Sequence, residues 1–111
     1  MTREEQNVAL ATAFGWQDIH YGWDGYGERS IRGWLGTAPG EQRQRLIPDY
    51  TYDLHALHHA EALLTDLQRD IYGCILAGYA LPAGGERWAC AHATAAQRAE
   101  ALLKTLGLWT E

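Results

Sequence analysis

The chain has 111 residues, a size at which one domain with one hydrophobic core is usual. Apolar residues make up 47% and charged residues 21%, which excludes a disordered chain. The net charge of -5 argues against direct binding to duplex DNA, which favours a basic surface, and no apolar run reaches the length of a membrane span.

The aromatic residues give a first indication of function. Five Trp and six Tyr stand against one Phe, a bias typical of contact surfaces because these rings join apolar area to a polar tip.

The acidic start MTREEQNVAL argues against a secretory signal, so we expect a cytoplasmic protein. Cys74 and Cys90 lie in apolar stretches and are expected to be buried, reduced and free of metal, with a disulfide between neighbouring strands as the alternative.

The first elements predicted along the chain are a helix and a β-hairpin. Thr2 and Glu5 form a capping box, in which each side chain bonds an otherwise unpaired backbone N–H, and so begin a helix over Thr2–Phe14. The stretch WQDIHYGW predicts a short strand. The turn signal Asp24–Gly25 then leads to a second, antiparallel strand over Ser30–Leu35.

A long loop and a second helix are predicted next. The stretch Gly36–Pro48 has no periodicity, and its length is one at which loops are often functional. Thr51 or Asp53 can cap a helix that runs to about Leu67. Its expected buried face recurs at intervals of three and four residues and comprises Leu54, Leu57, Ala60, Leu64 and Leu67.

The last third of the chain predicts a second hairpin and a closing helix. The apolar run Ile71–Leu81 is interpreted as a central strand, PAGGE as its turn, and Arg87–His92 as the returning strand. Thr94 and Gln97 repeat the capping-box pattern and open a helix that ends near Leu106.

These elements together predict an α+β protein. Two hairpins make one four-stranded, largely antiparallel sheet, and amphipathic helices cover its faces. We therefore expect a single domain over residues 1–111 with an α/β/α sandwich and the order αββαββα.

Several short motifs resemble the phage ABA sandwich domain family. They are the pattern A-x-A-x-G-W-x-D-I over Ala11–Ile19, the loop dipeptide Pro39–Gly40, the stretch I-P-D-Y-T-x-D-L over Ile47–Leu54, and the closing helix over Ala93–Gly107. The resemblance implies an α/β/α sandwich and a small bacteriophage accessory protein in the host cell cytoplasm. It implies no catalytic residues.

Catalytic and metal-binding patterns are weak. His55 and His59 lie one helical turn apart, as paired metal ligands do, with His58 beside them. The sequence H-E-x-x-H is absent and no motif supplies a third ligand, so we expect no metal and no cofactor. Ser30 has no nucleophile signature around it. We therefore expect a protein that is not an enzyme, with a small His-dependent metalloenzyme as an alternative.

A basic, aromatic stretch is the predicted binding surface. Arginine recognises carboxylates and phosphates in a bidentate manner and stacks on rings, and half of the eight arginines fall between residues 29 and 45. A solvated loop with internal ion pairs is the other interpretation. The predicted contact residues are Tyr26, Arg29, Arg32, Trp34, Arg43 and Arg45.

The expected function is stoichiometric binding. The first hypothesis is an inhibitor of a host antiphage defence system that docks on a host protein or protein complex, much as anti-CRISPR proteins do. The alternative is a sponge that sequesters a nucleotide immune signal between subunits of a homo-oligomer. A passive structural or folding-helper role is a further possibility.

Overall fold

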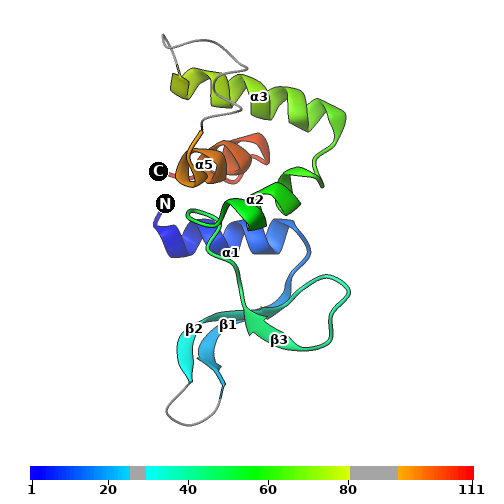
Figure 1. Ribbon diagram of the computed structural model, residues 1–111, viewed down its shortest axis with the longest axis vertical. Coiled ribbons are helices and arrows are strands. Elements are labelled where there is room, and N and C mark those ends of the chain that lie inside the picture. Colours follow the sequence, from blue (N-terminus) through cyan, green and yellow to red (C-terminus); the bar gives the residue numbers. More distant parts are fainter. Residues whose placement is uncertain (26–29, 81–92) are drawn as a thin grey trace.

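The computed structural model describes residues 1–25, 30–80 and 93–111. In this part of the chain four helices and three strands form a mixed α+β structure (Figure 1). The elements are α1 Arg3–Ala13, β1 Gln17–Asp24, β2 Ile31–Thr37, β3 Gln44–Leu46, α2 Leu54–Glu61, α3 Asp66–Ala80 and α5 Ala95–Thr105.

The predicted helix starts of α1, α2 and α5 are confirmed. The Thr2 hydroxyl accepts a hydrogen bond from the Glu5 backbone N–H, and the Glu5 carboxylate accepts one from the Thr2 backbone N–H. Thr94 and Gln97 make the same reciprocal pair at α5. Of the two candidates at α2, Asp53 is the cap. Each cap satisfies backbone N–H groups that have no partner within the helix.

The predicted first hairpin is also confirmed. β1 pairs with β2 in antiparallel fashion, and Asp24 lies opposite Ile31 next to the turn. A bulge interrupts the register early in β1, where Asp18 has a φ of 54°. β3 pairs with the other edge of β2, so the order is β1-β2-β3. β3 lies inside Gly36–Pro48, which the sequence predicted as a loop without regular structure.

The prediction of a strand over Ile71–Leu81 is wrong. Residues up to Ala80 belong to helix α3, and the predicted helix from Thr51 to Leu67 is two shorter segments, α2 and the start of α3. Thr65 and Gln68 form a third capping box that begins α3: Gln68 N–H donates to Thr65 Oγ1 at 3.2 Å, and Thr65 N–H donates to Gln68 Oε1 at 2.9 Å. The other predicted strand of that hairpin, Arg87–His92, lies outside the described residues.

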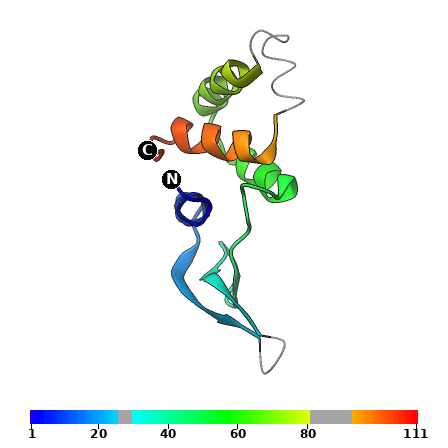
Figure 2. The same cartoon turned by 90° about the vertical axis from the view of Figure 1, so that its left-hand side faces the viewer.

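The expected α/β/α sandwich is therefore not seen in the described part of the chain. The three strands lie together at one end of the molecule, α1 lies beside them, and α2, α3 and α5 stack beyond α1 (Figures 1 and 2). The result is an elongated shape with extents of 51 × 26 × 25 Å.

The hydrophobic core lies between the helices. Its fully buried large side chains come from all four of them: Leu10 of α1, Leu57 of α2, Leu76 of α3, and Leu102 and Leu103 of α5. The predicted buried face of the second helix holds only in its middle, because Leu54 and Leu67 are exposed while Leu57, Ala60 and Leu64 are buried.

Candidate functional site

The structure divides the predicted contact residues between two places. Arg32 and Trp34 lie on β2, near the hairpin turn. Arg45 lies on β3 opposite Gly36, four residues along β2 from Arg32, which is roughly 13 Å in an extended strand. Arg43 is exposed just before β3. Tyr26 and Arg29 lie outside the described residues, so the six residues do not form one surface that the structure describes.

One group of side chains lies on one face of the hairpin, which we call the hairpin face and define as Tyr21, Trp23, Arg32 and Trp34. Tyr21 lies opposite Trp34 and Trp23 opposite Arg32 in the strand register, which puts all four on the same side of the sheet. The Arg32 guanidinium carbon lies 5.0 Å from the centre of the Tyr21 ring and 5.7 Å from that of Trp23. The Tyr21 and Trp34 rings meet edge to face at 5.6 Å. These contacts hold the arginine against the rings.

Exposure separates the roles of the aromatic side chains on the hairpin face. Trp23 is 61% exposed and Tyr21 49%. Trp34, the predicted anchor, is half-buried, and its indole Nε1 is buried without a hydrogen-bond partner in the described part of the chain. Trp34 therefore supports the face by packing, while Trp23 and Tyr21 present the accessible rings.

A second place is a cleft between the sheet and α2, which we call the α2 cleft. Its volume is about 530 Å³, and Trp16, Glu41, Arg45, Tyr50, His55 and His59 are among the residues that line it. Burial raises the pKa of the Tyr50 phenol, and this effect outweighs a hydrogen bond with Trp16 and the charge of Arg45, which both lower it. Tyr50 is therefore a neutral part of the wall.

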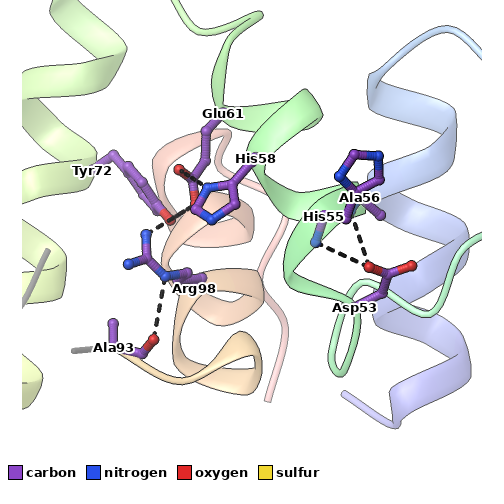
Figure 3. A network of polar contacts seen from close by, with 8 residues as sticks. All are labelled: Asp53, His55, Ala56, His58, Glu61, Tyr72, Ala93 and Arg98. Atoms are coloured by element: carbon purple, nitrogen blue, oxygen red, sulfur yellow. Dashed lines mark hydrogen bonds and ion pairs between the residues drawn. The ribbon is translucent and has the colours of Figure 1, made fainter. Parts of the chain in front are cut away.

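His55 and His58 of α2 point in different directions (Figure 3). The His55 and His59 rings meet edge to face, with their centres 4.7 Å apart, at the α2 cleft. His58 instead faces Glu61, with Nδ1 3.4 Å from the carboxylate. Within residues 1–25, 30–80 and 93–111, no three His, Cys, Asp or Glu side chains gather closely enough to hold a metal ion.

A polar network around Glu61 joins three helices (Figure 3). Glu61 Oε1 accepts hydrogen bonds from the Tyr72 hydroxyl at 2.8 Å and from Arg98 Nη1 at 3.1 Å. Burial, helped by the hydrogen bond to Glu61 and its negative charge, raises the pKa of Tyr72. Burial opposes the charged form of Arg98, but the charge of Glu61 and the surrounding hydrogen bonds raise its pKa above the ordinary value. The Glu61–Arg98 ion pair lies between packed helices, and Tyr72 holds its carboxylate in place. We therefore interpret this network as a contact that stabilises the fold.

The prediction of a buried Cys74 is wrong. Cys74 lies on α3 rather than in a strand, and its side chain is exposed beside Ile71. The error follows from the strand assignment, since a helix turns this part of the apolar run outward. Cys90 lies outside the described residues, so the disulfide alternative stays a prediction.

Comparisons with known proteins add no further information about function. No protein family, no curated protein and no solved structure matches the chain. The resemblance to the phage ABA sandwich domain family therefore rests on the short motifs quoted above. In the described part of the chain, no helix combines the length and apolar character needed to cross a membrane.

The sequence interpretation missed Tyr21 and Trp23 as contact residues. The turn signal at Asp24–Gly25 did not give their partners, because a two-residue turn there would pair Trp23 with Tyr26, whereas the structure pairs Trp23 with Arg32 and Tyr21 with Trp34.

Proposed function

We propose that this protein acts by stoichiometric binding to a protein partner and that the hairpin face is its main contact surface. The observation that carries the proposal is the exposed Trp23, stacked with Arg32 beside Tyr21. Trp, Tyr and Arg are the residues in which interface energy concentrates. Trp23 is 61% exposed and Tyr21 is 49% exposed on the same face of the hairpin, and adjacent exposed aromatic rings mark a contact surface more strongly than a single exposed side chain does.

The setting of this binding is inferred from the resemblance to the phage ABA sandwich domain family. On that basis the protein is a bacteriophage accessory protein that docks on a host protein complex in the host cytoplasm and inhibits an antiphage defence system. The negative net charge supports a protein target over duplex DNA. No catalytic step is part of the proposal.

Affinity capture from a lysate of bacterial host cells tests the proposal, with the purified protein as bait. Trp23→Ala should weaken binding of the captured partner by about 2 kcal/mol, which is the loss typical of an anchoring aromatic residue. Arg32→Glu should also weaken it, because it replaces the cation that stacks on both exposed rings.

Two matched variants serve as controls. Tyr52→Ala removes an aromatic side chain that is 82% exposed but lies outside the hairpin, and Arg43→Glu reverses an exposed charge at the other end of the sheet. Both should retain the partner. Equal loss of the partner with Tyr52→Ala or Arg43→Glu, or full retention with Trp23→Ala at an unchanged melting temperature, would contradict the proposal.

A further inference from the structure

The α2 cleft has the size and the walls of a small-molecule site. Its volume of about 530 Å³ falls in the range of small-ligand pockets. Buried Trp16 and Tyr50, half-buried Phe14 and exposed Pro39 supply aromatic and apolar surface. A flat ring can be accommodated against such walls.

Arg45 is the one arginine among the lining residues of the α2 cleft, and its guanidinium is held from two sides. It lies 4.7 Å from the centre of the Trp16 ring, and its Nε donates to Glu41 Oε2 at 2.9 Å. Its two terminal amino groups make no hydrogen bond to any residue that the structure describes. A guanidinium oriented in this way offers a planar pair of donors, the geometry that suits phosphate and carboxylate oxygens.

The histidines on α2 add donors from the facing wall. His55 and His59 are both exposed and both line the cleft. Each of the two carboxylates in the cleft is bonded through one of its oxygens: Glu41 Oε2 accepts from Arg45, and Asp53 Oδ1 accepts from the backbone N–H groups of His55 and Ala56 at 3.0 and 3.2 Å. Arg45, His55 and His59 supply hydrogen-bond donors on the walls of the cleft.

We propose that the α2 cleft binds a small planar anion of the mononucleotide class, an aromatic ring that carries one phosphate. The ring occupies the apolar walls, and the phosphate lies among Arg45, His55 and His59. A phosphate monoester has three terminal oxygens for these three side chains, whereas a carboxylate has only two. This site is separate from the hairpin face and does not depend on the protein partner proposed above.

A titration followed by NMR tests the inference with AMP as the probe. AMP should give saturable shifts of the Trp16 indole N–H signal and of the His55 and His59 ring signals. Adenosine and inorganic phosphate should each bind at least about tenfold more weakly, because each lacks half of the recognised groups.

Variants locate the site. Arg45→Gln should weaken AMP at least about tenfold, and Arg43→Gln, two residues away and not in the cleft, should leave it unchanged. Because Arg45 also packs on Trp16, the double variant His55→Ala/His59→Ala provides a second test on exposed side chains, and it should weaken AMP as well. Trp23→Ala on the hairpin face should not affect AMP, which separates this site from the contact with a protein.

Three outcomes would overturn the proposal. One is the absence of saturable AMP binding at millimolar concentrations. The second is that inorganic phosphate binds as tightly as AMP, which would mean that the cleft binds an anion without recognising the aromatic ring. The third is that indole-3-acetate binds more tightly than AMP, which would mean that the cleft prefers an aromatic carboxylate to an aromatic phosphate.

Discussion

At the scale of single residues, Asp49 connects the segment before α2 to helix α1. Its Oδ1 accepts hydrogen bonds from Asn7 Nδ2 at 3.1 Å and from the Thr51 hydroxyl at 2.6 Å, and Arg3 lies 3.7 Å from its Oδ2. Asn7 in turn accepts a hydrogen bond from the backbone N–H of Tyr50. Partial burial raises the pKa of Asp49, but the hydrogen bonds from Thr51 and Asn7 and the charge of Arg3 outweigh it and lower the pKa.

This lowered pKa predicts acid sensitivity. A carboxyl whose pKa is lower in the folded state stabilises the fold above its ordinary pKa, and the contribution is lost as the pH falls through the folded-state value. Asp49→Asn should therefore lower the melting temperature at neutral pH, and its difference from the unsubstituted protein should shrink between about pH 5 and pH 2. Asp66→Asn, at a fully exposed side chain, is the control and should show no such trend. A constant difference over this range would contradict the role of Asp49.

At the scale of elements, α3 shows how an apolar run can be a helix rather than a strand. Tyr72 and Leu76 point toward the core, whereas Ile71 and Cys74 face outward, a pattern with the helical period. The capping box of Thr65 fixes where this helix begins.

Removing that cap tests the helix directly. Thr65→Ala should destabilise the protein by about 1 kcal/mol in a urea titration, since Gln68 N–H loses its acceptor. The matched control is Thr12→Ala inside α1, where the hydroxyl bonds only a carbonyl of its own helix and alanine is the better helix former. Unchanged stability in Thr65→Ala would argue that Thr65 does not cap α3.

Local signals made part of the fold predictable. The capping residues Thr2, Asp53 and Thr94 and the turn at Asp24–Gly25 act within a few residues, so the sequence predicts α1, the starts of α2 and α5, and the first hairpin. The apolar part of the helix over 66–80 was mistaken for a strand, because a short apolar run is compatible with either a buried strand or a helix.

The candidate sites were less predictable than the helix starts, because they depend on contacts between residues that are distant in the sequence. The basic, aromatic composition of the segment singled out Arg32 and Trp34. Their partners Tyr21 and Trp23 depend on the strand register, which the turn signal at Asp24–Gly25 did not give. The separation of Arg45 from Arg32 depends on the pairing of β3 with the far part of β2, a contact that no local pattern indicates. The α2 cleft likewise combines residues from the sheet and from α2.

At the scale of the whole molecule, the Glu61 network holds the helical end together. Glu61 belongs to α2, Tyr72 to α3 and Arg98 to α5, and Arg98 is only 7% exposed (Figure 3). A buried charge without its partner is costly, so the network matters most when one member is removed.

Glu61→Ala should therefore lower the free energy of unfolding by about 3 kcal/mol, because it removes the carboxylate of the ion pair between Glu61 and the buried Arg98. Chemical denaturation measures this loss. Asp66→Ala removes an exposed carboxylate that lies 4.0 Å from Arg69 and should change stability by less than about 1 kcal/mol. Similar losses in both variants would show that the Glu61 contact is no stronger than a surface ion pair.

The elongated shape has a consequence for how this protein can diversify. The large side chains that are fully buried belong to the helices, whereas Tyr21, Trp23 and Arg32 lie on the hairpin at the other end. Substitutions at distant sites without shared neighbours act almost independently on stability. If the hairpin face is the contact surface that we propose, substitutions there can change binding while the leucine core stays the same, and binding and folding then depend on different residues of one small chain.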